Sequence, residues 1–241
     1  MRTSRTDSQH RASGWRGAWP RAMSMALGTT LSTTLCTTLC TTLCLTLGIS
    51  MTVSAQDRMP PIPPERMTEA QKAAVAEITA ARKVGISGPF VPLLRSPEVM
   101  NRARALGDYL RFNSVLPPRL SEFAILITAR RWSQNYEWDA HAALARQGGL
   151  SPEVIAAIAD GRRPDRMAAD EEIIYTFCDE LQRLQSISDA TYARAVGAFG
   201  EQGVIDVLGI SGYYTLLAMV LNTARTPVPA GHLPGLAPFP R

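Results

Sequence analysis

Residues 119–158 read RLSEFAILITARRWSQNYEWDAHAALARQGGLSPEVIAAI, and this stretch decides the fold. Its segment 123–129 is apolar on every side, which is typical of a helix in the middle of a core. A second helix is expected over roughly residues 135–147, and the Gly148-Gly149 pair ends it. Consecutive helices with short connections indicate an all-α domain.

Helical patterns continue on both sides of this stretch. Thr68 and Gln71 have the spacing of a capping box, and Ser96 before Pro97 is typical of an N-cap followed by proline. No sustained alternation of strand type and no Gly-rich phosphate loop occurs. About eight helices are therefore expected within one all-α domain, residues 67–225. They cover residues 68–83, 96–112, 119–133, 135–147, 151–160, 168–185, 188–199 and 203–223.

The N-terminal residues 1–55 have a different composition. They begin with five arginines against one acid, continue into an uncharged Leu/Thr/Cys-rich segment, and end in Val53-Ser54-Ala55. These are the three parts of a secretory signal peptide, so the sequence predicts a periplasmic or secreted protein. An uncleaved signal anchor is the alternative. Pro-rich segments, residues 56–66 and 226–241, flank the helical domain.

Removal of the predicted signal changes the charge and cysteine content. The chain has 25 basic and 21 acidic residues, and the signal contains five and one of them, which leaves twenty of each. A neutral domain gives no support for nucleic-acid binding. Three of the four cysteines lie in the signal, so Cys178 remains alone. A single cysteine excludes an internal disulfide and a thiolate metal cluster in the mature chain.

One group of polar residues is not explained by solvated helix faces. Glu122 lies near the start of the apolar helix, where a buried carboxylate needs a partner. Gln134, Glu137 and His141 are spaced i, i+3, i+7 and share one helix face. If the two helices pack as a hairpin, Glu122 and His141 can meet and provide groups for proton transfer. A structural Glu–His hydrogen bond that clamps the helices is the alternative.

This region resembles the carboxymuconolactone decarboxylase family, within the wider AhpD-like superfamily. The resemblance rests on Glu122 in its apolar helix, on the Tyr136-Glu137-Trp138-x-x-His141 pattern, and on the Gly-Gly-Leu-Ser hinge that follows. It extends over roughly residues 65–225. The resemblance implies an all-α fold and assembly as trimers or hexamers, with sites close to subunit interfaces.

The chain departs from the peroxidase branch of this superfamily. In that branch a Cys-x-x-Cys pair follows the glutamate, whereas Gln134 and Glu137 occupy the two positions here. Thiol chemistry needs a thiolate nucleophile and a resolving partner, so the sequence does not support a thiol peroxidase. Cys178 lies in another helix among apolar residues, where a core position is expected.

In the decarboxylase branch the substrate is a small lactone bearing a carboxylate. The resemblance implies His141 as proton donor or base, Glu137 as its partner or second acid/base group, and Glu122 as the orienting relay. Arg130 or Arg131 could hold the substrate carboxylate, although surface arginines near a helix end are the simpler interpretation. Further candidates at the substrate site are Gln134, Tyr136, Trp138, Tyr213, Tyr214 and Asn222.

Two functions remain open at this stage. The first is an exported lyase or related acid/base enzyme that acts on a small carboxylated lactone or ring compound. The second is a non-catalytic helical oligomer that binds a small hydrophobic acid. No cofactor is expected, and a metal ion on Glu122, Glu137 and His141 is only an alternative to a hydrogen-bonded cluster. A pocket that encloses these three residues is expected of an enzyme, and the enzyme hypothesis fails if His141 is fully packed with no adjoining cavity.

Overall fold

The computed structural model describes residues 56–229 and 236–238, which lie in one compact unit, Met51–Arg241. The predicted signal peptide, residues 1–55, lies outside the described residues. The described part of the chain is helical and contains no strand, as expected. Its elements are η1 (Pro64–Arg66), α1 (Glu69–Arg82), α2 (Phe90–Leu93), α3 (Pro97–Phe112), α4 (Pro118–Arg131), α5 (Asn135–Gln147), α6 (Pro152–Ala159), α7 (Ala169–Leu184) and α8 (Asp189–Ala224).

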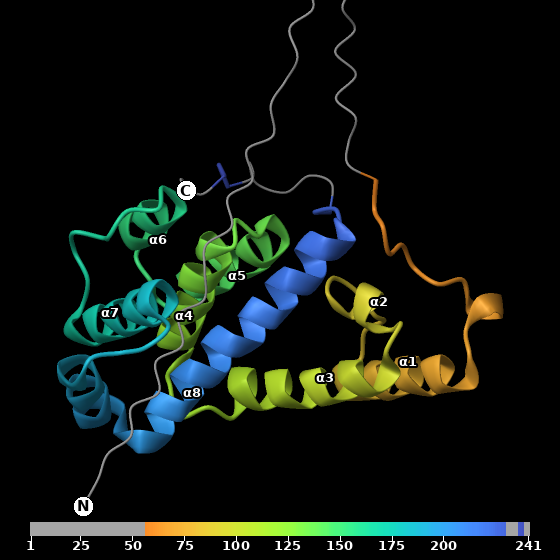
Figure 1. Ribbon diagram of the computed structural model, residues 1–241, viewed down its shortest axis with the longest axis horizontal. Helices are drawn as coiled ribbons and strands as arrows, with labels where there is room; N and C mark the ends of the chain where they lie inside the picture. Colours follow the sequence, from red (N-terminus) through yellow and green to blue (C-terminus); the bar gives the residue numbers. More distant parts are fainter. Residues whose placement is uncertain (1–55, 230–235, 239–241) are drawn as a thin grey trace, which may run out of the picture. The chain divides into compact units, whose positions relative to one another are not determined.

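Helix α4 lies at the centre of the core. Residues 123–130 are all buried, which confirms the prediction from their apolar pattern. Helices α5, α6, α7 and α8 all pack against α4 (Figure 1). The carboxylate of Glu122 therefore stands on the most enclosed helix of the domain.

Two of the predicted helix starts have the expected side-chain bonds. The backbone N–H of Thr68 donates to Gln71 Oε1 at 2.9 Å, and Gln71 N–H donates to Thr68 Oγ1 at 3.3 Å, which completes the capping box. Ser151 accepts from the backbone of Val154 at 3.2 Å. Ser96 occupies the N-cap position of α3 but accepts no hydrogen bond through its side chain.

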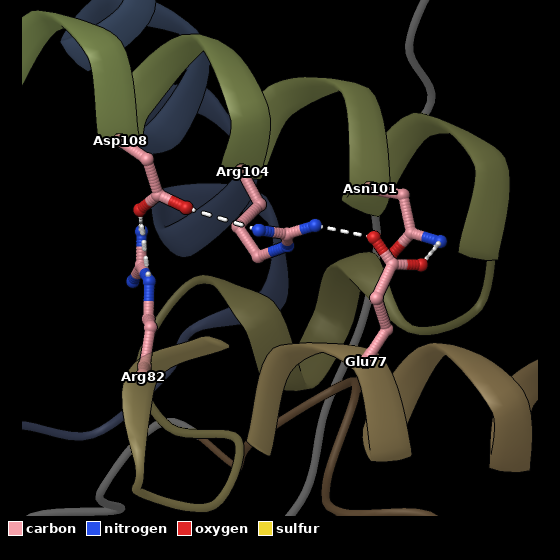
Figure 2. A network of polar contacts seen from close by, with 5 residues as sticks. All are labelled: Glu77, Arg82, Asn101, Arg104 and Asp108. Carbon is pink, nitrogen blue, oxygen red and sulfur yellow. Dashed lines mark hydrogen bonds and ion pairs between the residues drawn. The ribbon is translucent and has the colours of Figure 1, made fainter. Parts of the chain in front are cut away.

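A chain of ion pairs fastens α1 to α3 (Figure 2). Asp108 accepts from Arg82 Nη2 at 2.7 Å and from Arg104 Nη1 at 3.0 Å. Arg104 also pairs with Glu77, whose second oxygen accepts from Asn101 Nδ2 at 2.9 Å. Carboxylates within the α1–α3 contact thus neutralise the positive charges of Arg82 and Arg104.

Helix α8 runs between helices α4, α5, α6 and α7 on one side and helices α1 and α3 on the other (Figure 1). Two separate helices were predicted here. The structure confirms this, because Gly200 has non-helical torsions (φ 70°, ψ 173°) and divides α8 into two helical segments at a kink. By length and composition α8 could cross a membrane. Its apolar residues Val207, Leu217 and Leu221 are nevertheless buried against the other helices, as in the core helix of a soluble domain.

A buried carboxylate fixes the turn between α3 and α4. Asp206 of α8 accepts from Ser114 Oγ at 2.8 Å and from the backbone N–H of Val115 at 2.9 Å. Tyr109 lies at 3.4 Å from its other oxygen. Because this turn leads directly into α4, Asp206 helps to set where α4 begins.

Candidate functional site

The α4–α5 hairpin brings Glu122, Glu137 and His141 together. His141 Nδ1 lies 2.6 Å from Glu122 Oε2, and His141 Nε2 lies 3.5 Å from Glu137 Oε2. The imidazole thus stands between two carboxylates, one on its own helix and one on α4. The side chains of His141 and Glu137 are 6% and 5% exposed, whereas that of Glu122 is 12% exposed. The cluster therefore touches solvent mainly through Glu122.

Two opposing influences set the charge of His141. Burial is the largest single influence and favours the neutral ring. The hydrogen bonds and negative charges of Glu122 and Glu137 together outweigh it and raise the pKa of His141 above its ordinary value. A protonated imidazole at near-neutral pH is the form that can deliver a proton.

Glu137 has one oxygen without a partner. Its Oε1 is buried and accepts no hydrogen bond within the described part of the chain. Leaving a buried acceptor unsatisfied costs on the order of 1–3 kcal/mol. The Glu122–His141 hydrogen bond already joins α4 to α5, so this contact does not require the unsatisfied oxygen of Glu137.

Two adjacent tyrosines of α8 form the wall next to His141. The Tyr214 ring meets the imidazole edge-on, with centroids 4.9 Å apart and an interplanar angle of 86°. Tyr213 packs edge-on against Tyr214 at 5.2 Å, and its hydroxyl lies directly against Gly107 of α3. Burial raises the pKa of Tyr213 to about 12 and the pKa of Tyr214 well above its usual range. Both phenols therefore stay neutral, so each can donate a hydrogen bond.

Other candidates from the sequence have structural contacts nearby. Gln134 caps α5, since its Oε1 accepts from Tyr136 N–H at 2.6 Å, and its Nε2 donates to Asn222 Oδ1 at 2.7 Å. Asn222 in turn donates to the carbonyl of Trp132 at 3.2 Å, which ties the end of α8 to the hairpin turn. Trp138 is part of the core.

Tyr136 packs against the glycine of the preceding loop. A Cβ on Gly88, where φ is +54°, would lie 2.7 Å from the Tyr136 ring, so glycine is needed at this position. Burial raises the pKa of Tyr136. The loop before α2 is thereby held against α5 next to Glu137.

Arg130 and Arg131 lie at the opposite end of α4 from Glu122. Eight residues separate Arg130 from Glu122, about 12 Å along a helix. Arg130 is buried and donates through Nη1 to the carbonyl of Ala237 at 2.5 Å, while Arg131 is exposed. Both line a small cavity of about 60 Å³, together with Ile158 of α6 and Tyr175 of α7. The structure does not bring them to His141.

The Glu122–His141–Glu137 cluster does not line the cavities of about 920, 60 and 310 Å³ in the described part of the chain. Besides the 60 Å³ cavity, a cavity of about 920 Å³ lies between Trp132, Leu181 and Leu208, and one of about 310 Å³ lies next to Met219. No group of three or more His, Cys, Asp or Glu among residues 56–229 and 236–238 is placed to hold a metal ion.

The cysteine of α7 is part of the core. Cys178 is fully buried, and its sulfur lies 3.8 Å from Ser211 Oγ. Burial raises the pKa of its thiol to about 12, so the thiolate is not formed near neutral pH. This confirms the expected core position.

One residue near the site was not identified from the sequence. Gly107 lies on α3, which had no recognisable motif at this position. A glycine in the interior of a helix was nevertheless an available signal, because it costs roughly 1 kcal/mol relative to alanine and often marks a close contact. Gly107 marks the contact with Tyr213.

Comparisons with known proteins agree with this geometry. Residues 97–171 match the Carboxymuconolactone decarboxylase family, and this segment contains Glu122, Glu137 and His141. No curated protein matches the chain. A solved structure with the same fold is the "alkylhydroperoxidase AhpD core", an uncharacterized peroxidase-related protein from Ralstonia eutropha JMP134. It aligns with a TM-score of 0.58 and 15% identity over 72% of this chain and 92% of its own. Residues 97–171 of the chain are therefore similar to the carboxymuconolactone decarboxylase family, and the chain has the AhpD-like fold.

Proposed function

We propose that this protein is an acid/base enzyme that performs a decarboxylation, or a related lyase or isomerase step, on a small carboxylated lactone or ring compound. The observation that carries this proposal is the buried cluster in which His141 stands between Glu122 and Glu137, with one Glu137 oxygen unpartnered. A hydrogen bond that only joins α4 to α5 would not need Glu137 as a second buried carboxylate beside His141.

The proposed step assigns a role to each residue. For a decarboxylation, the carbon–carboxylate bond breaks, CO2 leaves, and the bonding pair remains on the ring as an enolate. His141 delivers a proton from Nε2 to the enolate carbon, while Glu122 holds Nδ1–H and stabilises the charged ring. Glu122, the most exposed member of the cluster, then connects His141 to solvent for reprotonation.

A thiol peroxidase is not supported by these residues. The solved relative is described as peroxidase-related, but that description concerns the other protein. Here Gln134 and Glu137 stand where the peroxidase branch has its cysteines, and Cys178 lies buried on α7.

The burial of His141 favours a second function, binding without catalysis. Because His141 is buried and lines none of the three cavities, the cluster could serve a non-catalytic helical oligomer that binds a small hydrophobic acid. An enzyme would have to expose His141 to admit its substrate, whereas a Glu122–His141 bond that only holds α4 against α5 needs no such opening.

Turnover of carboxylated γ-lactones by the purified protein distinguishes the two functions. Release of CO2 and the product NMR spectrum are followed for the parent and for His141→Gln. We expect the variant to lose about 10²–10⁴-fold in rate, the usual contribution of a general acid or base. His232→Gln, which changes a histidine of the C-terminal tail, is the matched control and should keep the parent rate. Equal rates for His141→Gln and the parent would exclude the assigned role.

Export and assembly belong to the same proposal. We infer from the sequence that residues 1–55 are removed on export and that the mature chain forms a trimer or hexamer. N-terminal sequencing of protein recovered outside the cytoplasm should begin near Gln56. Light scattering of that material should give a mass three or six times that of one chain, and a monomer would contradict the assembly.

A further inference from the structure

The cavity of about 920 Å³ does not involve the Glu122–His141–Glu137 cluster. It is bordered by the end of α4, the end of α7, the middle of α8 and the C-terminal tail. Its α7 and α8 residues lie outside the segment 97–171 that matches the family. Binding sites for small organic ligands commonly have volumes of about 300–1,000 Å³. The cavity is therefore large enough for a ligand with more than one ring.

One face of α8 forms a wall of this cavity. Leu208, Ser211, Gly212 and Thr215 all line it, and their spacing of i, i+3, i+4 and i+7 places them on one stripe of the helix. Ser211 is only 4% exposed, whereas Gly212 is exposed. A Cβ on Gly212 would have no atom within 4 Å. The space next to Gly212 is thus open to a ligand.

Apolar side chains from other parts of the chain also line the cavity. They are Trp132, in the turn after α4, Leu181 of α7 and Pro238 of the C-terminal tail. Trp132 is 37% exposed, unlike Trp138, which is buried in the core. A partly exposed indole at a concave surface offers a flat apolar face for a ring or an alkyl chain. The lining therefore suits a ligand with an apolar body.

Two hydrogen bonds fasten the C-terminal tail next to the cavity. The backbone N–H of Leu236 donates to Asn135 Oδ1 at 2.6 Å, and the carbonyl of Ala237 accepts from Arg130 Nη1 at 2.5 Å. Leu236 also packs against the core. These contacts hold Pro238 at the cavity, so its border includes a segment far from α4 and α7 in the sequence.

Polar groups in the lining have hydrogen-bonding capacity left. Gln182 donates through Nε2 to Thr128 Oγ1 at 3.0 Å, but its Oε1 is buried and accepts no hydrogen bond from the described residues. The hydroxyl of Ser211 lies 3.8 Å from the sulfur of Cys178, which is a weak partner. Because buried polar groups are normally hydrogen-bonded, this wall favours a ligand that carries polar atoms as well.

The formal charge of the lining is positive. Among the described residues that line the cavity, Arg131 is the only charged one, and it lies in the last turn of α4. Free carbonyls at a helix end favour a cation, but the carbonyls of Thr128, Ala129 and Arg130 already accept from N–H groups of residues 132–134. The charge of Arg131 therefore favours an anionic group on the ligand.

We propose that this cavity binds a small amphipathic anion, with its apolar body against Trp132 and Gly212 and its anionic group at Arg131. The sequence suggested Arg131 for the substrate carboxylate at His141, whereas the structure places Arg131 at this separate cavity. Because the site does not include His141, the proposal does not rest on the proposed reaction.

Two fluorescent probes with the same rings test the proposal. They are 1-anilinonaphthalene-8-sulfonate, which is an anion, and N-phenyl-1-naphthylamine, which lacks the sulfonate. Affinities are measured by fluorescence titration at low salt. We expect Gly212→Phe to weaken binding of both probes at least about tenfold, because the new ring occupies the open space. Arg131→Gln should weaken binding of the sulfonate about tenfold and leave that of the neutral amine within about twofold.

Two control variants match these changes. Gly197→Phe adds the same ring to α8 at a glycine that also has open space around it but does not line the cavity. Arg146→Gln removes an exposed arginine from the last turn of α5, as Arg131→Gln does from α4. Both controls should bind the two probes as the parent does. Retained binding of the neutral amine shows that Arg131→Gln is folded, and melting temperature gives the same check for Gly212→Phe.

Three results would overturn the proposal. The first is parent-like binding of both probes by Gly212→Phe, and the second is an equal effect of Arg131→Gln on the two probes. The third comes from light scattering. If Gly212→Phe separates an oligomer of the parent into single chains, the cavity is an interface between copies of the chain and not a ligand site.

The outcomes are distinct from those of the turnover assay, since His141→Gln should bind both probes as the parent does. If His141→Gln abolishes turnover but Gly212→Phe leaves probe binding unchanged, the proposed function stands and the cavity site is wrong. If no lactone is turned over but probe binding depends on Gly212 and Arg131, the cavity site stands and the catalytic proposal fails.

Discussion

Glu122 and His141 are separated by 19 residues in the chain, and their side chains meet at 2.6 Å between Oε2 and Nδ1. This contact spans the α4–α5 hairpin and fixes the direction of the imidazole. With Nδ1 bound to Glu122, Nε2 points to Glu137 and to the edge of the site next to Tyr214. Nδ1 is therefore used in the contact between α4 and α5, and Nε2 is the nitrogen that can exchange a proton with a ligand in the proposed reaction.

The charge of His141 should make stability depend on pH. Its folded pKa is raised above the unfolded value of about 6.5, so protonation stabilises the folded state. This contribution is fully present below about pH 6.5 and is lost as the pH rises through the folded pKa. Urea unfolding at a series of pH values should show the free-energy difference between the parent and His141→Gln shrinking in that window.

Glu122→Gln provides the control for this assignment. The amide keeps the shape of the side chain but removes the charge that helps to raise the pKa of His141. NMR titration of the His141 ring should therefore give a lower pKa in the variant. A pKa equal to the parent's would mean that Glu122 does not control the proton.

Gly107 should not tolerate a larger residue. A Cβ at this position would overlap the Tyr213 hydroxyl, so Gly107→Ala should destabilise the protein by about 1–3 kcal/mol through overpacking. Gly197→Ala is the control, since nothing lies near its Cβ in α8. This change should stabilise the helix by roughly 0.5–1 kcal/mol. Equal effects in chemical denaturation would refute the close contact between α3 and Tyr213.

Cys178 should be unreactive in the native protein. Its thiol is buried and its pKa is raised to about 12, so a thiolate is not available to attack an alkylating reagent. Mass spectrometry after iodoacetamide treatment near pH 8 should show no modification of Cys178 until denaturant is added. Rapid labelling of the native protein would reopen the question of thiol chemistry.

Asp206 should be necessary for the turn that begins α4. Asp206→Asn replaces one acceptor by a donor that faces the donors of Ser114 and Val115. The loss is expected to be about 1–3 kcal/mol of unfolding free energy. Asp165→Asn changes an exposed acid of the α6–α7 loop and should stay within about 0.5 kcal/mol of the parent. A thermal denaturation series that shows no difference between the two variants would contradict the role of Asp206.

The sequence predicted those features that depend on local pattern. Residues 123–129 are apolar on every side, and only a central helix satisfies that pattern. Thr68 and Gln71 specify a helix start within three residues, and the structure has both bonds. The Glu122, Glu137 and His141 candidates also followed from helical spacing, because α4 and α5 are consecutive and pack as a hairpin.

Features that depend on the packing of distant helices were not predictable. The ion pair between Arg104 of α3 and Glu77 depends on where α1 lies, which no local pattern specifies. The break at Gly200 falls between the two helices predicted over residues 188–199 and 203–223, but the direction that its torsions give to the second segment was not predictable. The separation of Arg130 from Glu122, in contrast, could have been predicted, because eight residues span about 12 Å along the helix expected over residues 119–133.

The unpartnered oxygen of Glu137 has a practical consequence for finding the natural ligand. A small molecule that donates a hydrogen bond to it removes a penalty that the empty protein carries, and binding to the folded state alone adds about 2.7 kcal/mol at a hundred times its dissociation constant. Melting temperature is then a readout that needs no assumption about the reaction. A metabolite library screened by thermal shift, with Glu137→Gln as the reference protein, would rank candidate ligands by how much they stabilise the parent alone.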